Sequence, residues 1–320
     1  MERKNRVNWK PVITAIIVLI LVLCFGSSVF ADSKYTDDKK EFTAEVYFDV
    51  LEVSADQIRN KTDFVPEIAI VLGSGLGDFA DTIDVVTEIP FSEIYGFPVS
   101  TAPGHEGKLI FGTYAGRNLA VMKGRVHYYE GYSMYDVVFP VRVLSLLGAD
   151  TVILTNSAGS LNPDYKTGEF VVIEDQISSF VPSPLIGENI EELGDRFTDM
   201  THIYDEELLQ LILDIGEEKD IPVHSGIFMQ VTGPQYETPA EIRFYQSIGA
   251  DTIAMSLAAE AIAARHMGMR VCGISCITNM GAGMEDVELS HNLVNENADK
   301  TTADFEEIVH ALIERMPPVQ

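Results

Sequence analysis

The chain has 320 residues, 46% of them hydrophobic, and its 49 acidic and 22 basic residues give a formal net charge of -27. This length and apolar fraction allow a substantial core, in one large α/β domain or two small ones. The acidic balance argues against nucleic-acid binding, because no basic surface is available to neutralise phosphates.

The first 31 residues have the features of a secretory signal. A basic stretch, MERKNRVNWK, precedes an apolar run from Val12 to about Phe25, and a small-residue site ends at Ala31. The run is shorter than the ~20 residues that span a bilayer. We therefore expect a signal peptide at 1–31, cleaved after Ala31, and an exported mature chain at 32–320. The alternative is an uncleaved anchor, through which alone the chain would contact a membrane.

Beyond a polar stretch, helical patterns alternate with short apolar runs. The segment from Phe42 to Thr62 has helical periodicity and is expected to cover a sheet. Short runs rich in Val and Ile predict strands at Ile68–Leu72, Lys108–Tyr114, Leu119–Met122, Thr151–Thr155, Phe170–Ile173, Gly226–Val231, Thr252–Met255 and Val271–Thr278. Further helices are expected at Met134–Leu147, Asp205–Lys219, Pro239–Ser247, Glu260–Met267 and from about Ser290 to Arg315.

This alternation predicts the fold class. Strands that are apolar on both faces and separated by helices indicate a three-layer α/β/α single domain with a mixed, mainly parallel central sheet. Cys272 and Cys276 lie roughly 13 Å apart on one expected strand, too far for a disulfide, so both are expected in the core. No HExxH, paired CxxC or calcium-type loop indicates a metal site.

A glycine-rich loop follows the first expected strand, in AIVLGSGLGDF. Gly73, Gly75 and Gly77 allow a sharp turn with exposed N–H groups, but Asp78 stands where a dinucleotide fingerprint requires its last glycine. Ser74 can offer its hydroxyl and N–H to an anion, helped by the N-terminus of a following helix. An ordinary turn is the alternative.

Other ionisable residues also follow expected strands, where α/β sheets bind ligands. Arg125 and His127 in GRVHYYEG lie two residues apart on an extended segment, so they point the same way. They suit a phosphate because arginine supplies bidentate donors. The alternative is a solvated strand end that pairs with Glu130.

Two strand-end residues have the chemistry to recognise a heterocycle. Glu237 in GPQYETPAE can accept ring N–H groups, or it can simply complement a helix N-terminus. Asn279 can donate and accept together, or it can simply form a turn. From spacing alone, His291 is expected at the surface.

Together these segments resemble the trimeric purine nucleoside phosphorylases, which act on inosine and guanosine. The matching segments run in family order from about Ile68 to His291: VLGSGLG, TAPGHEGKLIFG, GRVHYYEGY, TNSAGSLNP, GPQYETPAEIR, GADTIAMS, TNMGAGM and LSH. The resemblance implies phosphorolysis of the N-glycosidic bond of 6-oxopurine (deoxy)ribonucleosides, which gives the free purine and (deoxy)ribose 1-phosphate. It also implies a homotrimer that needs no metal and no organic cofactor, with inorganic phosphate as co-substrate.

The resemblance assigns residues as well. Phosphate would be held by Ser74, Arg125, His127, Ser256 and the backbone N–H of Ser157, with His105 beside it on a mobile loop. Tyr129, Met255 and His291 would line the ribose, while Glu237 and Asn279 would bind the purine and Tyr236 would stack on it. The catalytic groups would be Asn279, Glu237 and His127. Phe180 would reach into a neighbouring subunit's site.

The chain departs from the family pattern at several positions. SLAAE replaces a TVPE-like segment and loses a proline beside Ser256, Gln176 replaces a usual histidine, and Tyr236 stands where phenylalanine is frequent. Met280 follows Asn279, as in bacterial-type members. None of these changes removes a named catalytic group, although the first could alter phosphate affinity.

Three alternatives are considered. A methylthioadenosine phosphorylase would have the same fold, but that family places aspartates where Asn279 stands and lacks Glu237. An exported, non-catalytic nucleoside-binding protein is disfavoured because Arg125, His127, Glu237 and Asn279 are all retained. A hydrolase that used water would leave the anion site without a purpose.

Overall fold

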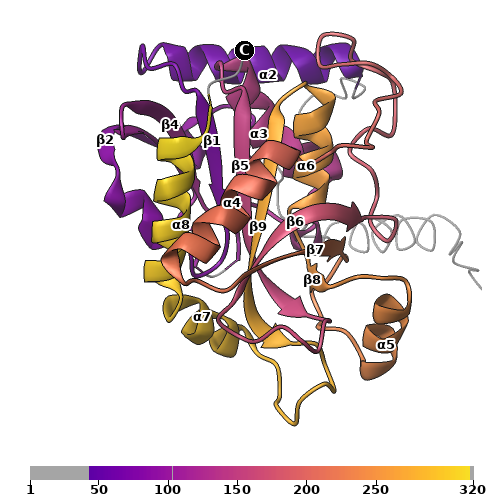
Figure 1. Cartoon of the computed structure of the whole chain (residues 1–320). Coiled ribbons are helices and arrows are strands. Elements are labelled where there is room, and N and C mark those ends of the chain that lie inside the picture. The colour runs from indigo at the N-terminus through magenta and orange to yellow at the C-terminus, as the bar shows by residue number, and fades with distance from the viewer. Residues whose placement is uncertain (1–42, 103, 318–320) are drawn as a thin grey trace, which may run out of the picture. The chain divides into compact units, whose positions relative to one another are not determined.

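The central feature of the fold is a nine-stranded sheet, seen in a computed structural model that describes residues 43–102 and 104–317 (Figure 1). The expected signal peptide and its cleavage site lie outside these residues. The strands are β1 Ile68–Leu72, β2 Asp84–Pro90, β3 Lys108–Tyr114, β4 Arg117–Lys123, β5 Thr151–Ser160, β6 Phe170–Ile177, β7 Val223–Gln230, β8 Thr252–Ala254 and β9 Arg270–Met280. Within the described ranges, no helix is long and apolar enough to cross a membrane.

The sheet is mixed, and its strand order is β2-β3-β4-β1-β5-β8-β7-β6-β9. The parallel pairs are β1–β4, β1–β5, β5–β9, β6–β7 and β7–β8. The antiparallel pairs are β2–β3, β3–β4, β5–β8 and β6–β9. The predicted mixed, mainly parallel sheet is confirmed. Because β9 pairs with both β5 and β6, the strands from β5 to β9 also close into a ring, which the sequence pattern did not predict.

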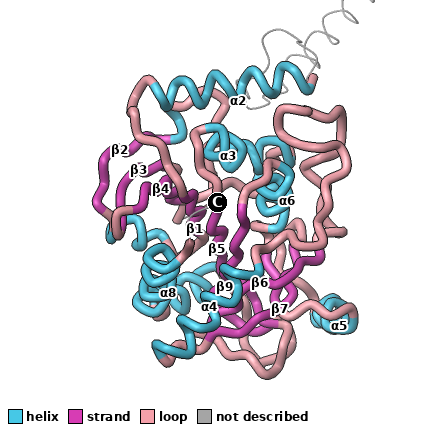
Figure 2. Tube along the Cα trace, turned by 45° about the horizontal axis from the view of Figure 1, so that its top comes forward, coloured by secondary structure: helices cyan, strands magenta, loops and turns pink. Residues whose placement is uncertain are grey.

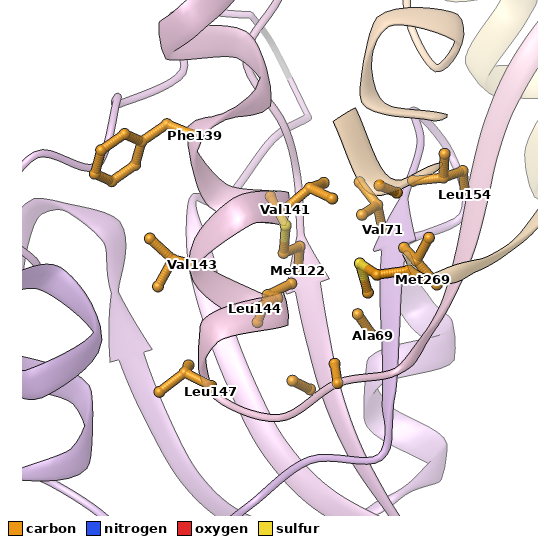
Figure 3. Close-up of a cluster of buried hydrophobic side chains, with 14 of the residues drawn as sticks. Ala69, Val71, Met122, Phe139, Val141, Val143, Leu144, Leu147, Leu154 and Met269 are labelled. Carbon is orange, nitrogen blue, oxygen red and sulfur yellow. The ribbon is translucent and has the colours of Figure 1, made fainter. Parts of the chain in front are cut away.

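Helices cover both faces of the sheet (Figures 1 and 2). On one face, α2 (Ala44–Arg59), α3 (Met134–Leu146) and α6 (Ala258–His266) pack with Ala69 and Val71 of β1. On the other, α4 (Glu206–Lys219) and α8 (Thr302–Arg315) pack with the alternate residues Ile68, Ile70 and Leu72. Figure 3 shows the first of these clusters. Alternation along a strand sends successive side chains to opposite faces, which accounts for the predicted three layers.

One expectation about the elements was wrong, and one strand was not predicted. The last helix is divided into α7 (His291–Asp299) and α8, and buried Thr301 at the break donates from its hydroxyl to the Ala298 carbonyl at 2.8 Å. Strand β2 was not predicted, because most of its residues are exposed and provide no buried apolar run. Cys272 and Cys276 are buried free thiols in β9, as expected, and burial raises the pKa of both.

Candidate active site

A cavity of about 640 Å³ lies among the strand-end segments singled out in the sequence. Its walls come from the loop after β1, the segment after β4, the ends of β5, β8 and β9, the segment before α5 (Pro239–Ser247), and α7. It brings together most of the expected site residues: Ser74, Arg125, His127, Tyr129, Ser157, Tyr236, Glu237, Met255, Ser256, Asn279 and His291. His105 and Phe180 do not line it.

The glycine loop is fixed against the end of β5. The Gly73 N–H donates to the Thr155 hydroxyl at 3.2 Å, and the Ser157 hydroxyl donates to the Ser74 carbonyl at 2.8 Å. These bonds place Ser74 and Ser157 together at one end of the cavity. The expected helix after the loop is only a 3₁₀ helix, Gly77–Thr82, so the loop's own N–H groups are the better anion donors there.

We expect Gly73→Ala to lower the free energy of unfolding by about 1–3 kcal/mol, because overpacking costs this much. A Cβ at this position would lie 2.6 Å from the Asn156 Cα and 2.9 Å from the Thr155 carbonyl oxygen, both of them backbone atoms. Urea unfolding measures the change. Gly77→Ala is the control, since its Cβ would meet only the Lys123 side chain, at 3.4 Å, and should shift stability by less than about 1 kcal/mol. Equal effects from the two variants would contradict the prediction.

Arg125 is the buried cation of the site. Its Nε donates to Glu260 Oε1 at 3.2 Å, and both side chains are only 2% exposed. Its Nη1 donates to the Thr155 carbonyl, whereas Nη2 is buried with no hydrogen-bond partner among the described residues. One edge of the guanidinium is therefore available to an anion. The alternative pairing of this strand end with Glu130 is wrong for Arg125, because Glu130 binds His127.

Glu130 holds the His127 ring. The ring Nδ1 lies 2.9 Å from Glu130 Oε1, which also accepts from the His127 backbone N–H at 2.7 Å. The other carboxylate oxygen accepts from the Thr101 N–H at 2.5 Å and from its hydroxyl at 2.7 Å. Burial favours a higher pKa, but these hydrogen bonds outweigh it and lower the pKa of Glu130 to about 2. With an ionised carboxylate at Nδ1, the Nε2 of His127 is the nitrogen available to a ligand.

His105 supports this anion end from outside the cavity lining. Its Nδ1 accepts from the Arg125 backbone N–H at 3.1 Å, which leaves Nε2–H to donate to the Ser74 hydroxyl at 3.1 Å. Burial, with the charges of His127 and Arg125, lowers the pKa of His105 to about 3. The ring is therefore neutral at pH 7 and fixed in one tautomer.

Ser256 lies just before the N-terminus of α6. The Leu257 N–H donates to Glu260 Oε2 at 3.0 Å, and the Ala259 N–H donates to Gln230 Oε1 at 2.9 Å. The proline of the family's TVPE-like segment would stand at Ala259 in SLAAE, and proline has no N–H. Ala259 does have one, and Gln230 accepts its hydrogen bond. The α6 N-terminus favours an anion at the Ser256 side of the cavity.

An amide and a carboxylate also line the cavity. Asn279 is 8% exposed, and its Oδ1 accepts from the Thr278 hydroxyl at 3.1 Å. Its Nδ2 donates to the Met280 carbonyl at 3.0 Å. Gly159 makes room for it, since a Cβ there would lie 2.9 Å from this Nδ2. Glu237 is half-buried, and burial raises its pKa although a hydrogen bond from its own backbone N–H opposes the shift.

Aromatic side chains complete the walls. The Tyr129 ring stacks on His127 with centroids 4.7 Å apart, and burial raises the pKa of Tyr129 to about 12. Exposed His291 begins α7, as expected for a surface residue, and it lines the cavity, whereas its contact with ribose stays a prediction. Phe180 instead packs edge-on against Tyr245 of α5 at 5.7 Å, and its reach into a neighbouring subunit stays a prediction.

Sequence reasoning missed two carboxylates that orient site residues. Glu130 was considered only as the partner of a solvated strand end, although its i,i+3 spacing from His127 could have suggested the contact. Glu260 lies 135 residues from Arg125, and no local signal connects them. Throughout residues 43–102 and 104–317, no group of three or more His, Cys, Asp or Glu residues is arranged to hold a metal ion.

This fold, with most of the expected site residues gathered in one cavity, defines an α/β protein of the nucleoside phosphorylase type. A model of the phosphorylase superfamily matches residues 67–314. Purine nucleoside phosphorylase 1 of Geobacillus stearothermophilus is 45% identical over 83% of this chain and 97% of its own. Purine nucleoside phosphorylase of Mus musculus is 38% identical over 87% and 98%.

A solved structure agrees with these relatives. Schistosoma mansoni purine nucleoside phosphorylase in complex with inosine superposes with a TM-score of 0.81 at 36% identity, covering 86% of this chain and 99% of that one. The chain belongs to the purine nucleoside phosphorylase family.

Proposed function

We propose that the protein catalyses the phosphorolysis of purine nucleosides, with a preference for 6-oxopurines such as inosine and guanosine. One observation carries this proposal. A single cavity is lined both by a buried, partly unpaired Arg125 with Ser74 and His127 and by Asn279 and Glu237. In the proposed pose the nucleoside lies between these two groups, with its glycosidic bond beside the anion.

The phosphate dianion is the proposed nucleophile. Arg125 Nη2, Ser74, Ser256, His127 Nε2 and the Ser157 N–H bind and orient it. As the C1′–N9 bond breaks, its electron pair moves to the purine and positive charge develops on the sugar, which the dianion stabilises. A phosphate oxygen then bonds C1′, giving ribose 1-phosphate. Positioning and charge stabilisation supply the rate enhancement.

The purine end stabilises the leaving group. Asn279 donates a hydrogen bond to N7 as negative charge develops there, and Glu237 accepts from N1–H and from the exocyclic N2 of guanine. The proton that the hydrogen phosphate loses on bonding C1′ is the proton that the departed purine gains. An adenine has no N1–H, so the Glu237 carboxylate disfavours it. This pair also opposes the methylthioadenosine phosphorylase alternative. Tyr236 stacks on the base, while Tyr129, Met255 and His291 contact the ribose.

Further properties are part of the same proposal. The chemistry uses inorganic phosphate as co-substrate and requires no metal and no organic cofactor, because the residues above supply positioning and charge. We also propose a homotrimer, supported by the segments that resemble the trimeric family. We further propose export directed by residues 1–31, supported by the basic stretch MERKNRVNWK and the apolar run after it. Size-exclusion chromatography with light scattering tests the first, and mass spectrometry of the processed N-terminus tests the second.

The activity test is purine release by residues 32–320 from inosine, guanosine and adenosine, each with and without phosphate. We expect phosphate-dependent release of hypoxanthine and guanine, with adenosine much the poorer substrate. Adenosine is an essential comparison, because Schistosoma mansoni purine nucleoside phosphorylase has also been solved in complex with adenosine. Release without phosphate would indicate a hydrolase, and inosine binding without turnover would support the binding-protein alternative.

A further inference from the structure

We infer that Glu260 is a positioning residue for phosphate, whose one carboxylate fixes both Arg125 and the turn that carries Ser256. The inference rests on the proposed function, since it names what aligns the phosphate-binding groups. Arg125 follows β4, whereas Ser256 lies between β8 and α6. Two segments far apart in sequence thus meet on one side chain.

The geometry uses both oxygens of the carboxylate. Oε1 accepts from Arg125 Nε at 3.2 Å, and Oε2 accepts from the Leu257 backbone N–H at 3.0 Å. Glu260 and Arg125 are each only 2% exposed, so no solvent competes for these bonds. Two further observations show what each bond achieves.

The first bond aims the guanidinium. Glu260 occupies Nε, and the Thr155 carbonyl occupies Nη1. Because the fork is planar and rigid, these two anchors determine the direction of Nη2. That atom is buried without a partner in the described part of the chain, and Arg125 lines the cavity. The remaining donors are therefore held ready for an anion.

The second bond holds a strained turn. Leu257 has φ of 86°, in a region that residues with a Cβ rarely adopt. The surrounding structure must enforce it, and the Leu257 N–H bond to Glu260 does so at the residue next to Ser256. Losing this bond would let the Ser256 hydroxyl and the first turn of α6 shift.

A simple counter-ion role makes the opposite prediction. If Glu260 only neutralised Arg125, removing its charge would strengthen the attraction between Arg125 and phosphate. If Glu260 positions both Arg125 and the turn of Ser256, Glu260→Gln should weaken phosphate binding, although the charge of Arg125 is no longer neutralised. Glutamine has one acceptor oxygen and an NH₂ group, so a donor would face either Arg125 Nε or the Leu257 N–H.

The experiment measures the binding of phosphate and the use of inosine separately, with the protein of residues 32–320. Calorimetry gives the Kd for inorganic phosphate, and steady-state kinetics give KM for phosphate and for inosine. For Glu260→Gln we expect the phosphate Kd and KM to rise about 10- to 100-fold, as for a misplaced binding group, with inosine KM changed by less than about twofold.

Glu67→Gln is the matched control. Glu67 Oε2 also accepts from an arginine Nε, that of Arg117 at 2.9 Å, and from a backbone N–H, that of Asn118 at 3.3 Å. Glu67 does not line the cavity, so the Kd and KM of Glu67→Gln for phosphate should equal those of the wild-type protein.

Glu260→Asp keeps the charge but shortens the reach, and it guards against a Glu260→Gln chain that does not fold. We expect it to weaken phosphate in the same direction, by less than glutamine does. Unchanged or tighter phosphate binding in a folded Glu260 variant overturns the inference. Phosphate Kd is measured without turnover, so wild-type protein that bound phosphate yet released no purine would refute the proposed function alone.

Discussion

Replacing Asn279 with alanine is expected to lower kcat for inosine phosphorolysis by about 10²- to 10³-fold, the usual cost of losing one donor to a developing negative charge. The amide is buried at the end of β9 and is held by its bonds to Thr278 and Met280. Its hydrogen bond to N7 should strengthen as the purine departs, so the loss should appear in kcat more than in inosine KM.

Two further variants sharpen this test. Asn118→Ala is the control, because Asn118 Nδ2 donates to the Val65 carbonyl on the surface, at 3.0 Å, and kcat should not change. Asn279→Asp should raise the adenosine-to-inosine ratio of kcat/KM, since a carboxylate accepts from a 6-amino group. A kcat for Asn279→Ala within twofold of wild type would remove Asn279 from the mechanism.

Much of the fold follows from the sequence because its strands are buried on both faces. Strand β1 was predicted with its observed bounds, Ile68–Leu72, since all five residues are buried and apolar. Strand β9 extends beyond its prediction to Met280, because pairing with β5 continues through the polar residues at its end. The ring from β5 to β9 depends on such long-range pairing, which local patterns do not contain.

The candidate site could also be predicted only in part from the sequence. Residues at strand ends were identifiable because parallel strands deliver their ends to one edge of a sheet, and one cavity collects them. The supports of those residues were not identifiable. Glu260 appears in the sequence as an ordinary acid of a helix N-terminus, and only the tertiary structure pairs it with Arg125 of the segment after β4. Likewise, only the tertiary structure brings His105 into contact with Ser74.

The second large effect is expected at Glu237. Glu237→Ala should lower kcat/KM for guanosine by about 10³-fold and for inosine by about 10- to 100-fold. Guanine offers N1–H and the 2-amino group, hypoxanthine offers only N1–H, and each hydrogen bond to a charged group contributes roughly 1.5–3 kcal/mol. The guanosine-to-inosine ratio is therefore the quantity to measure. Equal losses for both nucleosides would contradict the proposed contact with N2.

The matched control for Glu237 is Glu241→Gln. Glu241 is exposed and closes the capping box of α5 with Thr238, and glutamine also serves that position. Both nucleosides should retain their wild-type constants in this variant, which separates the purine contact from the stability of α5.

Glu237 should also make purine binding pH-dependent. The surroundings of Glu237 determine whether inosine KM rises or falls on acidification. Burial raises the pKa of Glu237, so on acidification its carboxylate protonates at a higher pH than a free glutamate. A protonated carboxyl has a donor where N1–H needs an acceptor, and inosine KM should therefore rise as the pH falls through that raised pKa. Glu237→Gln carries no titrating group at this position, so the acid-side rise in inosine KM should be lost. Glu241→Gln should retain it at a slightly lower pH, because the charge of Glu241 also raises the pKa of Glu237. The same rise in both variants would assign the titration to another group.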